Sequence, residues 1–295
     1  NTPLEKLLWR IVSDGSERFD THFDLAVSYI EGGSAYYVHD HVSAAKKAAF
    51  VHVDYVQAGY TRRLDKDCYV DFDRIFAVSD ETAGVLAGVY PECQQKLSVF
   101  HNLIDTEAIR QKALLPAEKS MHEGIRLLTV GRLTPQKGFD CAVYALKLLL
   151  EKQYPVYWYI IGEGPEYGRL TQLARSLHVE DHFIFLGMQT NPYPYFKMAD
   201  FYIHATRFEG KSIAIQEAQV LGCAIAASDC SGNREQIVSG VDGLLCPFSP
   251  EGIANAVEYL IEHPQTAQSF GREAAQKACH FENDIHMIRD LLYLP

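Results

Sequence analysis

Two glutamates in one short stretch could contact a single ligand. Glu209 and Glu217 are separated by seven residues within 206–219, which reads TRFEGKSIAIQEAQ. The apolar run 201–205 before it predicts a strand, and a helix is expected to begin near Ser212. The free N–H groups at a helix start favour an anion. Because Glu209 would precede the helix and Glu217 would lie more than one turn inside it, they would face different parts of a ligand. Such a ligand would be polyhydroxylated and negatively charged at one end, as a nucleotide sugar is.

Two cations in another loop could bind the charged end of such a ligand. The chain contains 20 glutamates, so one pair at any fixed spacing is expected by chance, and other residues must support the site. Arg132 and Lys137 lie in GRLTPQKGFD, residues 131–140, which follows the predicted strand 125–130. Arginine can bind a phosphate in a bidentate manner and lysine is a compact point charge, so the two could neutralise a diphosphate without a metal. The alternative interpretation is a pair of solvated surface charges.

A glycine-rich turn follows the next predicted strand. It reads GEGPEYG over residues 162–168 and is the segment nearest to a dinucleotide-binding fingerprint. An NAD-type oxidoreductase is therefore an alternative, but it needs an acidic residue at the end of the following strand to bind the ribose. That strand, HFIFLGM, ends in Gly187 and Met188 instead. We interpret Gly162 as part of a tight turn that lets the backbone approach a ligand.

Short apolar runs alternate with helical patterns along the chain, which predicts βαβ units and parallel sheets. Residues 113–124 lose this periodicity and are predicted to be a linker. The linker would join an N-terminal domain, 1–112, to a complete doubly wound domain, 125–279. Residues 280–295 are predicted to form a C-terminal helix that packs back on the N-terminal domain. The three loops above would then meet at the carboxyl ends of the strands of one sheet, where doubly wound domains bind their ligands. The predicted strands are 25–29, 48–53, 74–78, 97–100, 125–130, 156–161, 182–186, 201–205, 224–228 and 243–246. The predicted helices are 34–42, 58–69, 80–90, 139–153, 166–178, 193–198, 212–221, 234–238, 250–263 and 265–294, the last with a break at 281–282.

Composition limits the class of function. A net charge of -11 argues against broad nucleic-acid binding, because a phosphate backbone demands a basic surface. The seven cysteines form no C-x-x-C pair, which favours reduced thiols in a cytoplasmic protein. No apolar run reaches about 18 residues, so no membrane span is predicted, and peripheral contact with the inner face of a membrane stays open. His39 and His41 form one H-x-H pair without a third ligand, so no metal site is predicted.

Several segments occur together in an order and spacing typical of one family. They are GRLTPQKG, GEGP, LGMQTNPYPYFKMADFYIHATRFEGKSIAIQEAQVLGCAIAASD and GVDGLLCP, with FDRIFAVSDETAGVL and VFHNLID in the first domain. From about Asp24 to His280, the chain resembles the retaining glycosyltransferases of family 4. The resemblance implies the GT-B fold, an α/β architecture in which two Rossmann-like doubly wound domains face a cleft. Nothing here matches the strand and glycine-rich loop that open the family's first domain, so either that segment is missing or the acceptor side is unusual. Because four strands are predicted in the first domain beside six in the second, and the chain begins at Asn1 without Met, we expect the first domain to be incomplete.

The resemblance also implies roles for individual residues. Glu209 would be the first glutamate of the family's E-x7-E motif, at the donor sugar, and Glu217 the second, at the ribose hydroxyls. Arg132 and Lys137 match the family's diphosphate-binding pair. His52 matches a histidine that faces the donor sugar across the cleft, the alternative being a partly buried structural histidine. Glu209 and His52 are thus the predicted catalytic residues.

Other positions of the motifs would bind the rest of the donor. Met188 or Gln189 would lie against the base, and the turn at Gly162 would approach the ligand with its backbone. The distal phosphate would be bound by the backbone of a four-residue segment, namely Gly210, Lys211, Ser212 and Ile213.

The activity that the resemblance implies is transfer of a hexose-type sugar from a nucleoside diphosphate to a glycan or lipid-linked acceptor hydroxyl. UDP is the default nucleotide, the anomeric configuration would be retained, and neither a metal nor another cofactor is expected. The leaving phosphate would help to deprotonate the acceptor on the same face, while Glu209 would position the sugar or stabilise its charge. Two alternatives stay open beside the oxidoreductase: a fragment that binds nucleotide sugar without transfer, and a nucleotide-sugar epimerase.

Overall fold

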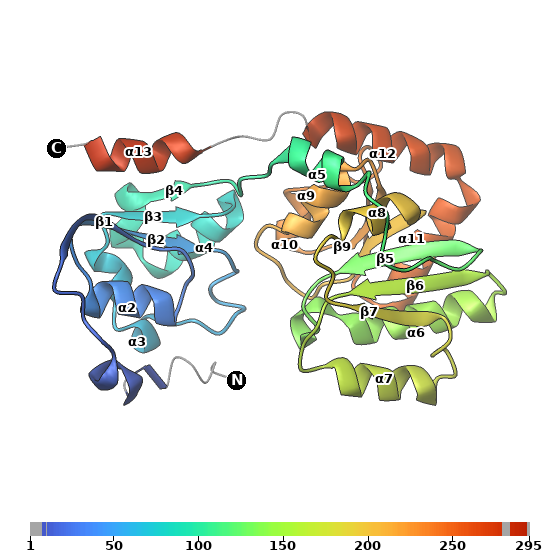
Figure 1. Cartoon of the computed structure of the whole chain (residues 1–295), viewed down its shortest axis with the longest axis horizontal. Helices are drawn as coiled ribbons and strands as arrows, with labels where there is room; N and C mark the ends of the chain where they lie inside the picture. Colours follow the sequence, from blue (N-terminus) through green and yellow to red (C-terminus); the bar gives the residue numbers. More distant parts are fainter. Residues whose placement is uncertain (1–7, 10, 279–283, 294–295) are drawn as a thin grey trace. The chain divides into compact units, whose positions relative to one another are not determined.

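The chain folds into two compact units (Figure 1). The structure is a computed structural model, and it describes residues 8–9, 11–278 and 284–293. The first unit comprises Asn1–Leu103 and Glu282–Pro295, and the second comprises Ile104–Phe281.

The first unit is built on a four-stranded parallel sheet in the order β1-β2-β3-β4. Its described elements, with 3-10 helices labelled η, are η1 (Ser13–Gly15), β1 (His22–Ser28), α2 (Gly33–His41), β2 (Ser43–Val51), α3 (Arg62–Asp65), η2 (Cys68–Asp71), β3 (Arg74–Ala77), α4 (Asp80–Val89), η3 (Pro91–Lys96), β4 (Leu97–Val99) and α13 (Ile285–Tyr293). One face of the sheet is buried against a cluster that contains Tyr55 and Tyr69. On the other face Phe50 and Phe76 pack with Leu291 of α13, so the last helix covers this sheet.

The second unit is built on a six-stranded parallel sheet in the order β10-β9-β8-β5-β6-β7. Its described elements are α5 (Thr106–Lys112), β5 (Ile125–Val130), η4 (Pro135–Lys137), α6 (Phe139–Glu151), β6 (Val156–Ile161), α7 (Tyr167–Ser176), β7 (Phe183–Gly187), α8 (Tyr193–Met198), β8 (Phe201–His204), α9 (Ile213–Val220), β9 (Ala224–Ser228), α10 (Ser231–Arg234), β10 (Leu244–Cys246), α11 (Pro250–Glu262) and α12 (Pro264–Ala278). This is the doubly wound strand order, in which the direction of winding reverses between β5 and β8.

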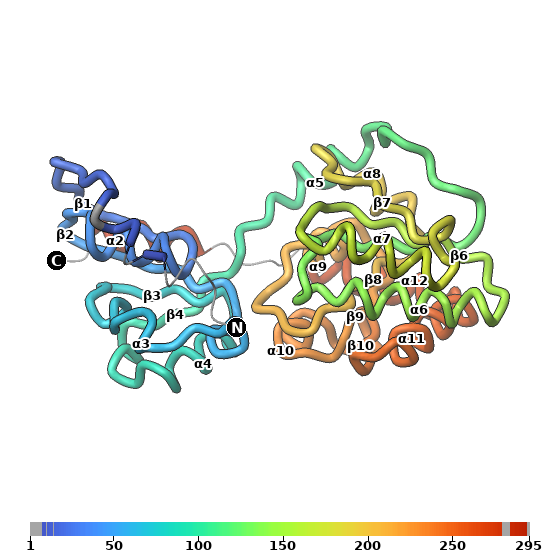
Figure 2. The backbone as a smooth tube through the Cα atoms, turned by 90° about the horizontal axis from the view of Figure 1, so that it is seen from below, coloured from blue at the N-terminus to red at the C-terminus, as the bar shows by residue number. Residues whose placement is uncertain are grey.

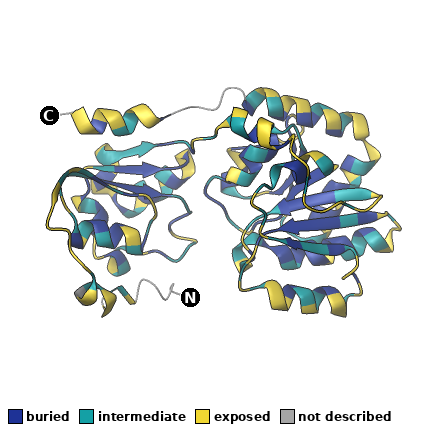
Figure 3. Ribbon diagram, viewed as in Figure 1, coloured by how far each residue is buried: buried dark blue, intermediate teal, exposed yellow. Residues whose placement is uncertain are grey.

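Helices cover both faces of the second sheet (Figure 2). Residues of α6, α7, α11 and α12 form the core on one face, around Trp158 and Ile203. Residues of α8 and α9 form the core on the other face, around Tyr159 and Tyr202. Because both faces are covered, the strands are the most buried segments of this unit (Figure 3).

Two predicted helices are wrong. The segment 58–69 forms only the short helix α3 and part of η2, because Gly59, Lys66 and Asp67 all have positive φ, which a continuous helix does not allow. The helix predicted at 234–238 is replaced by α10, which ends at Arg234. The turn is drawn towards the end of β9 because Asn233 Nδ2 donates to the Ser228 carbonyl at 2.8 Å.

The boundary between the units differs from the predicted linker. The chain passes from one unit to the other between Leu103 and Ile104, and 113–124 belongs to the second unit. The backbone N–H of Lys119 donates to Tyr195 Oη at 3.0 Å, and that of His122 donates to Tyr159 Oη at 2.6 Å. Loss of periodicity therefore marks a segment that packs through hydrogen bonds to core tyrosines. Of the predicted C-terminal helix 280–295, residues 280–283, 294 and 295 lie outside the described residues, and α13 belongs to the first unit.

No helix in the described part of the chain is long and apolar enough to cross a bilayer.

Candidate active site

The candidate site lies where the winding of the second sheet reverses. β5 and β8 are neighbours, with Leu127 opposite Phe201 and Leu128 opposite Tyr202. The loops that leave their carboxyl ends carry Lys137 and Glu209 respectively. Doubly wound domains bind ligands at this point, because the two following helices diverge to opposite faces and leave a crevice.

Hydrogen bonds fix these two loops to each other. The backbone N–H of Arg207 donates to the Gln136 carbonyl at 2.8 Å, and Gln136 Nε2 donates to the Phe208 carbonyl at 3.0 Å. Thr206 Oγ1 also donates to the Gln136 carbonyl, at 3.1 Å. The Arg207 guanidinium binds both carboxylate oxygens of Asp140, at 3.0 and 2.8 Å. The residues on either side of Lys137 and Glu209 are therefore held in place before any ligand binds.

Lys137 and Glu209 form an ion pair at the centre of the site. Lys137 Nζ donates to Glu209 Oε2, and the two side chains are 19% and 11% exposed. His204 Nε2 lies 3.5 Å from the same carboxylate oxygen. Burial alone would raise the pKa of Glu209, but the interaction with His204 and the charge of Lys137 outweigh it and hold the pKa at about 2. Glu209 is therefore a carboxylate at neutral pH.

The glycine-rich turn at 162–168 packs against the loop 131–140, which carries Arg132 and Lys137. A Cβ at Gly162 would lie 2.0 Å from the Gly131 carbonyl oxygen, and a Cβ at Gly164 would lie 2.4 Å from the Leu133 carbonyl oxygen. The Leu133 N–H donates to the Glu163 carbonyl at 2.9 Å. The close approach that these glycines allow is thus to the loop that carries Arg132, an exposed side chain. Packing between two backbones explains the G-x-G pattern here without a dinucleotide.

The helix that follows Glu209 has the expected start. Ser212 is the N-cap of α9, and its side chain accepts from the Ile215 N–H at 3.4 Å. Gly210 is buried, and a Cβ at Gly232 of α10 would lie 1.9 Å from its carbonyl oxygen. The turn between Glu209 and α9 is therefore fixed by backbone packing as well as by the cap. Of the other two residues predicted here, Lys211 is partly buried and Ile213 is half exposed.

Glu217 lies in α9 and is held by a tyrosine. Tyr193 Oη, on α8, donates to Glu217 Oε1 at 3.0 Å. Burial raises the pKa of Glu217, whereas the pKa of Glu209 is lowered, so the two glutamates have different environments. The predicted base contacts lie in the loop before α8, where Met188 is exposed and Gln189 Nε2 donates to the Leu186 carbonyl at 2.9 Å.

His52 belongs to the first unit, where it follows β2. Its backbone N–H donates to Glu31 Oε2 at 2.9 Å, and its Nδ1 lies 3.7 Å from the same oxygen. The imidazole packs against the rings of Tyr29 and Phe50. Burial alone would raise the pKa of Glu31, but the hydrogen bonds from His52 outweigh it and lower the pKa. His52 is thus a partly exposed imidazole beside a carboxylate that stays ionised.

Sequence reasoning missed the residues that hold the predicted ones in place. In the second unit they are Gln136 and Arg207 between the loops, Tyr193 on Glu217, and His204 next to Glu209. In the first unit, Glu31 accepts from the His52 backbone. His204 left a usable signal, because it is a histidine at the carboxyl end of a strand that leads into the motif.

The H-x-H pair is occupied by protein groups. His39 Nδ1 lies 2.6 Å from Asp40 Oδ1, and His39 Nε2 lies 2.8 Å from Asp71 Oδ2. His41 Nε2 lies 2.9 Å from Ser13 Oγ. Among the residues that the structure describes, no three acidic, histidine or cysteine side chains are grouped as a metal site requires.

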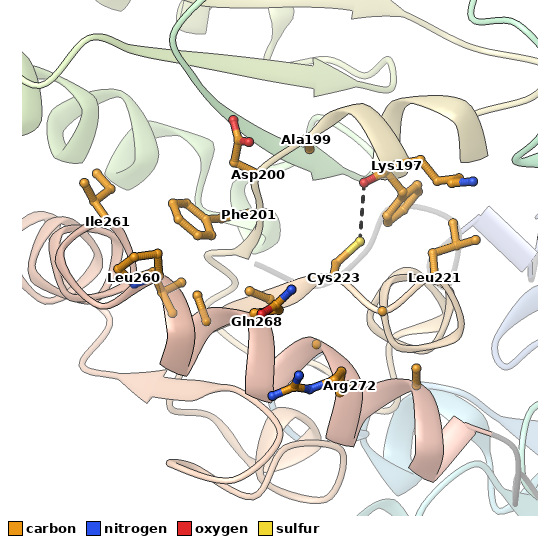
Figure 4. A pocket seen from close by; sticks show the side chains of 17 residues that line it. Lys197, Ala199, Asp200, Phe201, Leu221, Cys223, Leu260, Ile261, Gln268 and Arg272 are labelled. Carbon is orange, nitrogen blue, oxygen red and sulfur yellow. Dashed lines mark hydrogen bonds between the residues drawn. The ribbon is translucent and has the colours of Figure 1, made fainter.

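A cavity of about 530 Å³ opens at the opposite edge of the second sheet (Figure 4). It lies at the amino ends of β8 and β9, between Asp200, Cys223, Leu260 and Arg272. Cys223 Sγ donates to the Phe196 carbonyl at 3.5 Å, and burial raises the pKa of the thiol to about 12. A thiol with this pKa is not a nucleophile at neutral pH. The cavity is therefore at the end of the sheet opposite to the candidate site, and Arg132, Lys137 and Glu209 are not among the residues that line it.

Solved structures of glycosyltransferases share this fold. HepE of Anabaena, in complex with UDP-glucose, superposes with a TM-score of 0.75 and 18% identity over 99% of this chain and 83% of that chain. The pneumococcal O-GlcNAc transferase GtfA, in complex with UDP and GlcNAc, gives a TM-score of 0.69 and 16% identity over 98% of this chain and 60% of that chain. The two Rossmann-like sheets are those of the GT-B class of fold, as predicted.

The sequence comparisons identify the family. The family model of glycosyl transferases group 1 matches residues 110–277, which is more than half of the chain. The chain belongs to this family. It is 30% identical over 200 residues to the N-acetylgalactosamine-N,N'-diacetylbacillosaminyl-diphospho-undecaprenol 4-alpha-N-acetylgalactosaminyltransferase of Campylobacter jejuni, covering 67% of this chain and 53% of the relative. It is 29% identical to glycogen synthase of Mycobacterium tuberculosis over 62% of this chain and 44% of the relative. The chain thus spans about half the length of these relatives.

Proposed function

We propose that the chain is part of a glycosyltransferase that binds a nucleotide-sugar donor at the junction of β5 and β8. The observation that carries the proposal is the partly buried pair of Lys137 and Glu209 at the point where the sheet reverses its winding. UDP is the proposed nucleotide, because HepE and GtfA were solved with UDP or UDP-glucose. The proposed acceptor is a hydroxyl of a glycan or a lipid-linked glycan, the latter by analogy with the Campylobacter relative.

The proposed reaction transfers a hexose-type sugar with retention of configuration. Its barrier is departure of the diphosphate from an oxocarbenium-like centre, so catalysis depends on stabilising charge on the leaving group. Arg132 and Lys137 supply two positive charges, and the start of α9 adds about half a charge. With these groups on the phosphates, the proposed reaction needs no metal. Activity is expected to survive EDTA, and a loss that Mg²⁺ or Mn²⁺ restores would contradict this part of the proposal.

Glu209 is proposed to position the sugar and stabilise its charge. A carboxyl with a pKa of about 2 cannot act as a general acid near neutral pH. We propose that the leaving phosphate assists removal of the acceptor proton on the same face of the sugar, with His52 of the first unit facing the donor sugar. Covalent trapping of a glycosyl group on Glu209 would contradict this assignment.

A thermal-shift panel followed by a transfer assay tests the function. UDP and a UDP-sugar are expected to raise the melting temperature, while NAD, which needs an acidic ribose-binding residue after β7, is expected to have no effect. Stabilisation by NAD and by none of the nucleotide sugars would refute the glycosyltransferase proposal. Binding of UDP-sugars without transfer to any acceptor would instead favour a nucleotide-sugar-binding chain.

A further inference from the structure

His204 is a buried histidine next to Glu209, and the proposed reaction gives it no role. His204 is the last residue of β8 and is 2% exposed. Its Nδ1 lies 3.2 Å from Tyr202 Oη, a hydroxyl that is itself in the core. Its Nε2 is buried without a hydrogen-bond partner among the described residues, and it lies 3.5 Å from Glu209 Oε2. An imidazole nitrogen that is buried, unpaired and close to a carboxylate is poised to bond it.

The Glu209 carboxylate and the donor diphosphate would compete for the ammonium group of Lys137. In the structure its ammonium group is bonded to Glu209. In the proposed function the same group binds the diphosphate of the donor, which would draw it away from the carboxylate. Because Glu209 is only 11% exposed, water cannot readily replace the lost cation. A buried carboxylate that loses its partner without a substitute would oppose donor binding.

We propose that His204 is a positioning residue. When Lys137 moves to the donor diphosphate, His204 Nε2 donates a hydrogen bond to Glu209 Oε2 in place of the lysine. This inference rests on the proposed function. Tyr202 Oη lies 3.2 Å from Nδ1 and 3.5 Å from the Val130 carbonyl oxygen, so its one proton has two acceptors. The exchange uses the tautomer in which the hydroxyl donates to the nearer one, Nδ1, because the ring proton is then on Nε2, which faces the carboxylate. Burial lowers the pKa of His204, so the ring acts as a neutral donor. The exchange keeps Glu209 ionised and oriented toward the sugar while it releases the lysine.

Calorimetric titration with UDP tests the exchange in a double-mutant cycle. His204→Leu removes the donor at similar volume and is expected to weaken UDP binding about tenfold, the cost of one hydrogen bond to a charged group. In a Glu209→Gln background the release of Lys137 costs little, so the same substitution is expected to change the dissociation constant less than about twofold. His204→Gln, whose amide can donate from a similar position, is expected to restore most of the affinity.

A matched control separates the exchange from damage to the fold. Ile203→Val removes one buried methylene from the same strand on the opposite face of the sheet, and it is expected to leave UDP affinity unchanged at a slightly lower melting temperature. Equal affinity of wild type and His204→Leu would overturn the inference. So would a loss of the same size in the Glu209→Gln background. If wild type binds neither UDP nor another nucleoside diphosphate, the proposed function itself fails and the inference fails with it.

Discussion

Removal of the Lys137 ammonium group is expected to slow sugar transfer by at least about a hundredfold. The side chain is 19% exposed and its neighbours are fixed by hydrogen bonds, so the charge sits in a preorganised and partly dry position. A donor of this kind contributes on the order of 3 kcal/mol to stabilising charge in a transition state. Since each 1.4 kcal/mol changes a rate tenfold, Lys137→Ala should lose about two orders of magnitude in kcat/KM.

The assay is release of UDP during transfer, measured with the variant and a control. Lys147→Ala is the matched control, because Lys147 is a second lysine of the same unit whose ammonium lies 3.7 Å from the carboxylate of Glu151. Lys147 lies on α6 with a side chain that is 39% exposed, so the Lys147→Ala protein should transfer at the wild-type rate. The melting temperature and circular dichroism spectrum verify that Lys137→Ala is folded. A folded Lys137→Ala protein with near-normal turnover would refute the role of this residue.

Three further predictions concern the surroundings of the site. Because the pKa of Glu209 is about 2 and its ordinary value is 4.5, its ion pair stabilises the fold fully above pH 4.5 and loses that contribution as the pH falls towards 2. Urea unfolding at pH 6 and pH 3 should therefore show an advantage of wild type over Glu209→Gln that shrinks by about 2 kcal/mol, because pH 3 lies about 1.5 units below the ordinary pKa and each unit is worth about 1.4 kcal/mol; an unchanged advantage would contradict the pairing. Glu31→Gln should lower kcat about tenfold by loosening His52, and should have no added effect in a His52→Ala protein; equal losses in both backgrounds would show that Glu31 acts elsewhere. Gly232→Ala should displace the turn after Glu209 and cost about a hundredfold in kcat, whereas Gly168→Ala, with open space around it, should be neutral; similar rates for the two would disprove the constraint.

Periodicity was enough to predict the second sheet. The limits of β5, β6 and β9 agree with the predicted strands. The segments VYWYII of β6 and AIAA of β9 are continuous apolar runs, as is typical of strands that are buried on both faces. The order of the loops along the chain was also enough to place Lys137 and Glu209 together, since the winding rule brings the ends of β5 and β8 to one crevice.

Tertiary contacts were not visible in the same way. The segment 113–124 has no periodic pattern, yet it packs through backbone donors that bond to tyrosine hydroxyls of the core. The glycines of the 162–168 turn resemble a nucleotide motif, but the requirement they meet is the approach of one backbone to another. His204 lay inside the predicted strand 201–205, and its place before the motif was the only signal that its ring could lie close to Glu209, at 3.5 Å.

The most direct test is a structure of the protein with a UDP-sugar bound. Our account predicts diphosphate oxygens within hydrogen-bond distance of Arg132 and Lys137, with Lys137 moved off Glu209 and the sugar against that carboxylate. A nucleotide bound elsewhere, or bound with Lys137 still paired to Glu209 and no cation on its phosphates, would contradict it.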